Sequence, residues 1–222
     1  MKNLVMKKIV LLAVLIGWLK MIGMAQEKYE IITFTTEDGA HITGALFKAE
    51  GIKAVVLAHG AVFNKESWYP LAEKLQQQGI TALPIDFRGY GKSSGGSTGK
   101  KMYDVIGAVN YLRKQGYSRI SIIGGSMGGA ATLNALGMLK KPVDKVILLA
   151  PAGGPPVRSA ATQKLFVVSQ GERMYNGVKE IFTASAEPKQ LKVYPGSAHA
   201  QHLFNTEHAD DLTGLIVSFL QE

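Results

Sequence analysis

The chain has 222 residues, of which 46% are hydrophobic and 19% are charged, and it contains no cysteine. This composition is typical of one globular domain with a substantial core, and it excludes disulfides and thiolate zinc sites. The formal charge of +8 falls to +4 without the four lysines of the first 25 residues, since 21 basic residues then stand against 17 acidic ones. The sequence contains no cluster of basic residues of the kind that would predict nucleic-acid binding.

The beginning of the chain has the pattern of a secretory signal peptide. Three lysines precede the apolar run Ile9 to Leu19, and small residues follow in Gly23-Met24-Ala25. This run is too short for a comfortable membrane span. We therefore expect residues 1–25 to be removed before Gln26, and residues 26–222 to be an exported domain, periplasmic or secreted, without stable membrane insertion. An uncleaved N-terminal anchor is the alternative, which the lysine directly after the run disfavours.

The pattern of apolar runs predicts an antiparallel start followed by a parallel sheet. Tyr29 to Thr35 and His41 to Phe47 are β-rich, and Asp38-Gly39 between them is a strong hairpin signal. From Lys53 onward, short apolar strands alternate with amphipathic helices, which is typical of an α/β domain with helices on both faces. The expected strands are 54–58, 80–85, 119–123, 146–150, 165–168 and 191–194, and the expected helices are centred on 68–75, 105–112, 127–139, 178–182 and 212–219.

The segment Arg119 to Ala130 is the strongest candidate for catalysis. It predicts a buried strand, a glycine-rich corner and an apolar helix around the pattern Gly124-x-Ser126-x-Gly128. In such a nucleophile elbow the serine lies on a strained turn, and its neighbours must be small because a Cβ would clash with adjacent backbone. Two other matches, 91–95 and 95–99, have neither strand before nor helix behind, and we expect flexible loop there. Ser126 is the predicted nucleophile; a serine that merely fills a tight turn is the alternative.

A serine nucleophile needs a base and an acid, which in a parallel sheet should follow the carboxyl ends of strands. His199 and His202 both follow the last expected strand, and we favour His199 as the base. Two histidines three residues apart can also indicate a metal site, but no carboxylate or cysteine completes a ligand set, so neither metal nor other cofactor is expected. Glu172 is the acid that follows a strand between Ser126 and His199; a solvated glutamate paired with Arg173 is the alternative.

The negative oxygen that forms during acyl transfer needs backbone donors already in place. One donor should be the amide of Met127, directly after the elbow serine. The second should come from the loop Ala58 to Val62, where Gly60 allows the backbone to approach closely. His59 in this loop fits a hydrogen bond that braces the loop at least as well as a role as base.

These motifs resemble the α/β-hydrolase superfamily along the whole mature chain, and within it the serine hydrolases of carboxylesterase or dienelactone-hydrolase type. His59-Gly60-Ala61 resembles the oxyanion motif, Asp86 to Ser93 the D-x-R-G-x-G-x-S segment, Gly124 to Gly128 the elbow, and Pro195 to His199 the histidine loop. The resemblance implies an eight-stranded sheet with its second strand antiparallel.

The same resemblance implies roles for particular residues. Ala61 becomes the second oxyanion donor, and Asp86 and Arg88 become structural braces of the loops around the site. Two positions depart from the family pattern, because Glu172 stands where aspartate is more usual and Ala200 where glycine is frequent.

The expected chemistry is acyl transfer to water, because a serine stands where dehalogenases and epoxide hydrolases need a carboxylate. Only residues 151–164 separate the sixth strand from the next, so we expect no cap domain and an open site. Its expected lining is Phe63, Asn64, Met127 and Gln201. Such a site suits a small ester or an accessible acyl group on a larger molecule. A carboxylesterase is the first expectation; a thioesterase or peptidase with the same triad, or a catalytically inactive secreted binding protein of this fold, are the alternatives.

Overall fold

The structure is a computed structural model that describes residues 28–222, so the expected signal peptide lies outside the described residues. Its strands are β1 (Glu30–Thr35), β2 (Ala40–Leu46), β3 (Lys53–Ala58), β4 (Thr81–Ile85), β5 (Ser94–Gly95), β6 (Arg119–Gly125), β7 (Lys145–Leu149), β8 (Gln163–Ser169) and β9 (Lys189–Tyr194). Its helices are α2 (Tyr69–Gln77), α3 (Met102–Lys114), α4 (Met127–Leu136), α5 (Tyr175–Ala184) and α6 (Ala209–Gln221), with the 3-10 helices η1 (Lys65–Trp68) and η2 (Ala200–Asn205).

One sheet organises the domain, with the strand order β1-β2-β4-β3-β6-β7-β8-β9. The strand β2 is antiparallel to β1 and β4, whereas the pairs from β4 to β9 are parallel. The opening hairpin, the parallel sheet and the antiparallel second strand are therefore confirmed.

The short strand β5 differs from the prediction. We expected flexible loop at residues 91–99, but Ser94 and Gly95 pair with His41 and Ala40 of β2, so the sheet has nine strands rather than eight. A two-residue strand is too short to carry a periodic signal of its own.

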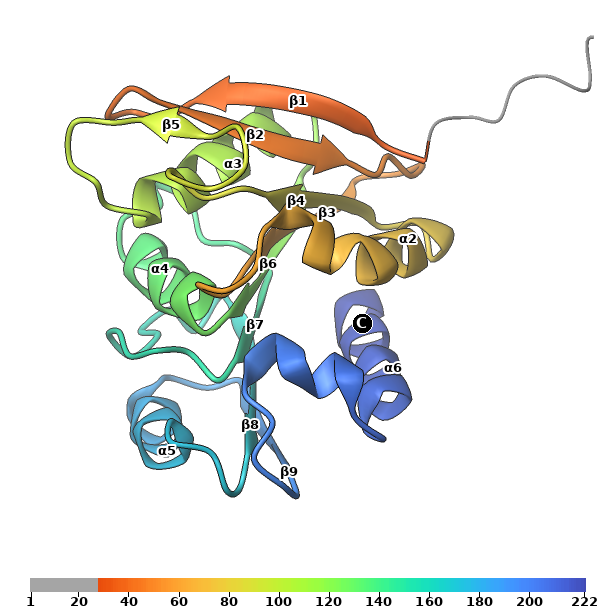
Figure 1. The fold of residues 1–222 in the computed structure, drawn as a ribbon, viewed down its shortest axis with the longest axis vertical. Coiled ribbons are helices and arrows are strands. Elements are labelled where there is room, and N and C mark those ends of the chain that lie inside the picture. The colour runs from red at the N-terminus through yellow and green to blue at the C-terminus, as the bar shows by residue number, and fades with distance from the viewer. Residues whose placement is uncertain (1–27) are drawn as a thin grey trace, which may run out of the picture.

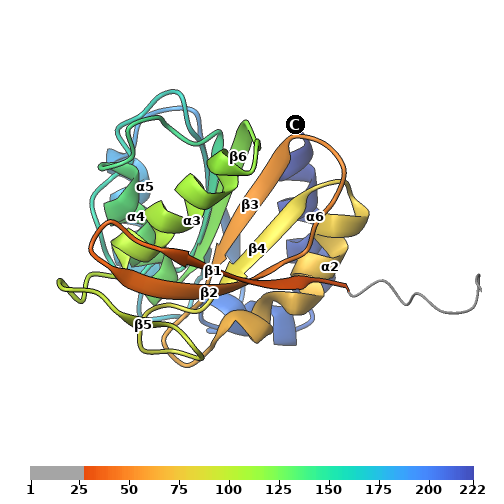
Figure 2. The same ribbon diagram turned by 90° about the horizontal axis from the view of Figure 1, so that it is seen from above.

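Helices cover both faces of the sheet, as the alternation of elements predicted. Figures 1 and 2 show α2 and α6 on one face and α3, α4 and α5 on the other. The central strands β3, β6 and β7 are consequently apolar and almost wholly buried. Within residues 28–222, no helix combines the length and the apolar character that crossing a membrane requires.

The strand register brings the candidate loops to one edge of the sheet. Ala58 at the end of β3 pairs with Gly124 of β6, and Gly125 pairs with Leu149 at the end of β7. The last residues of β8 and β9 pair with each other in the same way. The loops that follow these parallel strands therefore emerge side by side, although they come from distant parts of the chain.

Candidate active site

Ser126 lies on the strained corner that the elbow pattern predicted. Its φ is 49° and its ψ is −111°, between the end of β6 and the first residue of α4. A positive φ costs a residue with a side chain about 1–2 kcal/mol. The corner is held because the Ser126 amide donates to Leu149 O at 2.9 Å and its carbonyl accepts from the amides of Ala130 and Ala152, each at 3.0 Å.

The glycines around Ser126 are required by close packing of the backbone. A Cβ on Gly124 would lie 2.7 Å from the carbonyl oxygen of Gly128, and a Cβ on Gly128 would lie 2.2 Å from the carbonyl oxygen of Ala58. Real Cβ atoms do not approach backbone oxygens this closely. The pattern Gly124-x-Ser126-x-Gly128 thus lets α4 pack directly against the ends of β3 and β6, which projects the serine at the edge of the sheet.

The three predicted triad residues are brought together by this edge. His199 Nε2 lies 2.8 Å from Ser126 Oγ, and His199 Nδ1 is hydrogen-bonded to Glu172 Oε2. With Nδ1 donating to the carboxylate, Nε2 is free to accept the hydroxyl proton of Ser126. Ser126 and His199 are partly exposed, whereas the Glu172 side chain is only 2% exposed.

Glu172 reaches the histidine from a turn directly after β8. Its Oε1 accepts the amide proton of Ser169 at 3.0 Å, which leaves Oε2 for the imidazole. Ser169 Oγ also donates to Ala198 O at 2.6 Å, so the loops after β8 and β9 are tied together beside His199. Among the described residues Glu172 forms no ion pair with Arg173, the partner that the alternative interpretation required.

The loop after β3 is held by His59, in the bracing role considered for it. The Phe87 amide donates to His59 Nε2 at 3.2 Å, so Nδ1 carries the proton and donates to Gly60 O at 2.7 Å. Burial lowers the pKa of His59 below its usual value of 6.5, which favours this neutral form. The Gly60 carbonyl also accepts from the Phe63 amide at 3.1 Å.

The hydrogen bonds to Gly60 O fix the direction of the neighbouring amide. In a planar trans peptide the N–H of Ala61 points away from the C=O of Gly60. A Cβ built on Gly60 lies 3.6 Å from Ser126 Cβ, so this loop contacts the elbow. The amide of Met127 begins α4, where no carbonyl within the helix can accept it. The loop that carries Ala61 and the amide of Met127 thus both adjoin Ser126, while the two oxyanion roles remain a prediction.

Gln201 has a structural role that the sequence did not reveal, although we expected it to line the site. Its Oε1 accepts the Gly60 amide proton at 2.7 Å and its Nε2 donates to Ser67 Oγ at 2.7 Å. Ser67 Oγ in turn donates to Asn64 O at 2.6 Å. Gln201 is 4% exposed and lies two residues after His199. A single glutamine therefore links the histidine loop to the oxyanion loop.

Asp86 and Arg88 brace the surrounding loops, as the resemblance implied. Asp86 accepts from the Lys65 amide at 2.9 Å and pairs with its ammonium at 2.8 Å, and all of these groups are buried. Arg88 bridges Asp38 of the opening hairpin and Asp104 of α3, at 2.6 Å each. Neither Asp86 nor Arg88 contacts the triad residues through a hydrogen bond.

His202, the other histidine of the loop after β9, does not join the triad. His202 is exposed, and its ring lies against Phe63 with 5.0 Å between the centroids. Within the part of the chain that the structure describes, no group of three or more histidine, aspartate and glutamate residues is placed to hold a metal. His199, rather than His202, is thus the base candidate that the fold presents to Ser126.

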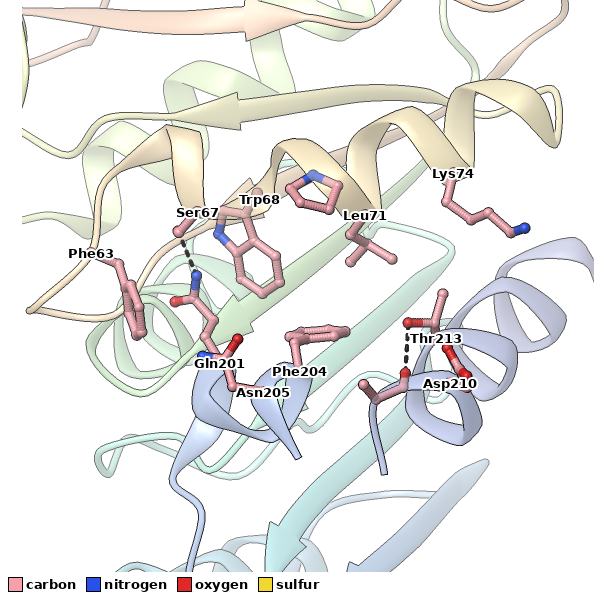
Figure 3. A pocket seen from close by; sticks show the side chains of 12 residues that line it. Phe63, Ser67, Trp68, Leu71, Lys74, Gln201, Phe204, Asn205, Asp210 and Thr213 are labelled. Carbon is pink, nitrogen blue, oxygen red and sulfur yellow. Dashed lines mark hydrogen bonds between the residues drawn. The ribbon is translucent and has the colours of Figure 1, made fainter. Parts of the chain in front are cut away.

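The surface around Ser126 is open on the side where a cap would be inserted. The segment from Pro151 to Thr162 forms neither helix nor strand and is mostly exposed. Phe63 and Gln201 line a hollow between η1–α2 and η2–α6, shown in Figure 3, while Met127 lines a separate hollow near Lys101. Three of the four expected lining residues are therefore divided between two hollows, and Asn64 is in neither.

Comparison with known proteins identifies the family. Residues 53–217 match the family model described as the alpha/beta hydrolase fold. An uncharacterised protein of Salmonella typhi, YfhR, is 30% identical over 128 residues, which is 53% of this chain and 44% of that protein. The thiohydrolase aneE of Aspergillus aculeatus is 34% identical over 120 residues, which is 50% of this chain and 38% of that protein. The chain thus spans less than half the length of these two relatives.

A solved structure agrees with this assignment at the level of the fold. The esterase of Exiguobacterium antarcticum superposes with a TM-score of 0.71 at 15% sequence identity, over 87% of this chain and 100% of that one. The sheet order, the elbow and the family match point to one conclusion. This chain belongs to the α/β-hydrolase fold family.

Proposed function

We propose that the protein is a serine hydrolase that cleaves carboxylic esters through an acyl-enzyme. The observation that carries the proposal is the 2.8 Å contact between Ser126 Oγ and His199 Nε2, with Glu172 on the opposite nitrogen of the ring. A hydroxyl is a weak nucleophile at neutral pH, and a base that is itself oriented by a carboxylate is what activates it.

In the proposed reaction, Ser126 Oγ attacks the ester carbonyl carbon while its proton moves to His199 Nε2. The carbonyl oxygen becomes negative and is stabilised by the amides of Ala61 and Met127. The bond to the alcohol oxygen then breaks, and the imidazolium donates its proton to that oxygen. Water, deprotonated by the same histidine, attacks the acyl carbon. The bond from that carbon to Ser126 Oγ breaks, and the imidazolium returns its proton to this oxygen, which releases the acid and restores Ser126.

Glu172 serves as the orienting acid. It holds the histidine tautomer with Nδ1 protonated and stabilises the imidazolium that forms when Nε2 takes the serine proton. Its second carboxylate oxygen is bound by the Ser169 amide, so the carboxylate cannot swing away without breaking that hydrogen bond.

A thioester is the second candidate substrate. A relative that is 34% identical over half of this chain is named a thiohydrolase, and the proposed triad can attack a thioester carbonyl by the same steps. The same triad could also hydrolyse peptide bonds. The alternative that is not an enzyme is an inactive secreted binding protein of this fold.

Two measurements test the proposal. A fluorophosphonate probe should label the wild type and fail to label Ser126→Ala, and an unlabelled wild type would favour the binding protein. A panel of p-nitrophenyl esters, acyl thioesters and aminoacyl anilides should show the highest kcat/KM for the esters. A higher kcat/KM for thioesters than for esters of the same acyl group would identify the protein as a thioesterase instead of an esterase.

Export is proposed on the sequence of residues 1–25 alone. Mass spectrometry of the protein from intact cells should find a mature chain that begins at Gln26, in a periplasmic or extracellular fraction. Recovery of a chain with its first residues intact, in the membrane fraction, would support the uncleaved anchor instead.

A further inference from the structure

The hollow in Figure 3 is lined by Phe63 and Gln201 of the two active-site loops but by none of the triad residues. It has a volume of about 480 Å³ and lies between η1–α2 and η2–α6. Helix η1 continues the loop that carries Gly60 and Ala61, and η2 begins directly after His199. Its two walls are thus the continuations of the oxyanion loop and of the histidine loop.

The inner end of the hollow contacts the catalytic edge through a single glycine. A Cβ built on Gly60 lies 3.4 Å from Gln201 Oε1, 3.5 Å from the Phe63 ring and 3.6 Å from Ser126 Cβ. Phe63 and Gln201 line the hollow, while Ser126 lies on the other side of Gly60. Gly60 and the Gln201 side chain bonded to its amide thus separate Ser126 from the hollow, and a substituent of a substrate held at Ser126 must extend past them to reach it.

The walls of the hollow are chemically suited to a carbon-rich group. Figure 3 shows the side chains of Leu71 and Phe204 turned toward each other from the two walls, beside the ring of Trp68. Trp68 is fully buried, and its ring lies 6.0 Å from that of Phe204. Aromatic and aliphatic walls favour apolar ligand surface, because contact removes that surface from water.

Several polar groups in the wall are already occupied by bonds within the protein. Gln201 Nε2 donates to Ser67 Oγ, and Ser67 Oγ donates to Asn64 O. Thr213 Oγ1 donates to the carbonyl of Ala209 in its own helix at 2.8 Å. A ligand that offered polar atoms to these groups would compete with existing hydrogen bonds, whereas an apolar ligand leaves them intact.

The charged residues of the hollow stand at its outer end. Lys74 and Asp210 are exposed, and Figure 3 shows them on the side opposite to Phe63 and Gln201. A ligand that enters from Ser126 thus meets Phe63 and the hydrogen-bonded pair Gln201 and Ser67 first, then the apolar wall, and charged groups only at the mouth. The inner part of the hollow contains no charged side chain to pair with an ionised substituent.

We propose that this hollow is the substrate subsite for an uncharged, extended apolar substituent of the ester, such as an alkyl or aryl-alkyl chain. The proposal rests on the proposed serine hydrolase function and adds the substrate class. This apolar substituent belongs either to the acyl group or to the alcohol of the ester, and the experiment below distinguishes the two.

The test uses two ester series and one pair of matched variants. The acyl series runs from p-nitrophenyl acetate to octanoate, and the alcohol series runs from ethyl to octyl acetate. Thr213→Phe narrows the outer half of the hollow from a half-exposed position on α6. Leu136→Phe is the control, since it enlarges a half-exposed residue of α4 that lines an unrelated hollow of about 380 Å³.

In one series the wild-type kcat/KM should rise up to about fourfold with each added methylene. Thr213→Phe should abolish this rise beyond a short chain and leave turnover of the shortest ester within about twofold, whereas Leu136→Phe should keep the whole wild-type profile. The series that responds identifies the acyl group or the alcohol as the occupant. A flat profile in both series, or a Thr213→Phe profile like that of the wild type, would overturn the subsite while leaving the hydrolase intact.

Binding without turnover tests the subsite even if no ester is cleaved. The sequence has two tryptophans, Trp18 in the expected signal peptide and Trp68 in the wall of the hollow. The chain that begins at Gln26 therefore carries Trp68 as its sole tryptophan, and Trp18→Phe gives the same in a chain that keeps its first residues. Titration with 1-octanol should shift Trp68 emission saturably, and Thr213→Phe should weaken this binding at least tenfold. The absence of a saturable shift would reject the subsite. A saturable shift in a protein that neither cleaves esters nor reacts with the fluorophosphonate would reject only the hydrolase function.

Discussion

Replacement of Gln201 by leucine should separate the placement of the oxyanion loop from the triad itself. Leucine has nearly the same volume as glutamine but can neither accept the Gly60 amide proton nor donate to Ser67. Gly60 and Gln201 are both buried, so the Gly60 N–H loses its acceptor in a place that water reaches poorly. An unsatisfied buried donor costs about 1–3 kcal/mol. We expect the free energy of unfolding to fall by this amount.

The catalytic effect of the same change should fall on kcat. Without Gln201, the peptide between Gly60 and Ala61 is held only through the bonds that His59 and Phe63 make to Gly60 O. Loss of a whole oxyanion donor lowers kcat by about 10²–10³, so a displaced donor should lower it by roughly 10- to 100-fold. KM for a short ester should change little, because the ground-state carbonyl gains less from these amides than the transition state does.

The assay uses p-nitrophenyl acetate, whose acyl group is too short to extend along the hollow of Figure 3. A trifluoromethyl ketone, which forms a negative tetrahedral adduct with serine, should lose affinity by the same factor as kcat. Ser67→Ala is the control, because it removes the outer hydrogen bond of Gln201 and leaves Gly60 paired; it should cost less than about threefold in kcat. The reasoning would be refuted if Gln201→Leu kept the kcat and the inhibitor affinity of the wild type. It would also be refuted if Ser67→Ala lost as much kcat and inhibitor affinity as Gln201→Leu.

Three further changes, the first with a control on α5, test other parts of the site. Gly128→Ala should destabilise the fold by about 3 kcal/mol or more in urea unfolding, because its Cβ would lie 2.2 Å from the carbonyl of Ala58. Gly177→Ala on α5, where nothing lies within 4 Å, should instead stabilise by up to about 1 kcal/mol. Glu172→Gln should lower kcat by about 10²- to 10⁴-fold in steady-state ester hydrolysis while circular dichroism stays unchanged. Burial lowers the pKa of His59 below 6.5, so on acidification the unfolded chain binds this proton before the folded chain does. The free energy of unfolding should therefore be highest above about pH 6.5 and decline below it. In urea unfolding at pH 7 and pH 5, His59→Asn should show a smaller decline than the wild type.

Features fixed by neighbouring residues could be predicted from the sequence. The hairpin at Asp38-Gly39 and the corner at Ser126 depend on local backbone conformation, and both are found where the sequence placed them. The position of Glu172 followed from geometry as well, since a residue just after a parallel strand must lie at the carboxyl edge. Pro84, a local misfit for a central strand, is nevertheless part of β4 and pairs with Leu57.

The partners of the bracing side chains, which lie in distant segments, could not be predicted. Gln201 bonds to a residue 141 positions earlier in the chain. The bracing role of Arg88 was implied by the resemblance, but its partners Asp38 and Asp104 lie 50 and 16 positions away and were not foreseen. A glutamine or arginine in a polar loop has no periodic pattern that distinguishes a buried brace from a solvated side chain. The helix α4 also ends at Leu136, three residues earlier than expected, because apolar residues continue past its end.

The hydrogen bonds around His199 explain how a site without a cap can hold its geometry. The histidine loop is tied to the β8 turn through Ser169 and Glu172, and to the oxyanion loop through Gln201. Each tie crosses between loops that leave the same edge of one sheet, so the base is fixed by the body of the domain. A capped hydrolase can complete its site by closing a lid, whereas this segment between β7 and β8 offers no such element. Preorganisation must therefore come from buried side chains beneath the surface, and Gln201 is the residue whose loss should reveal it.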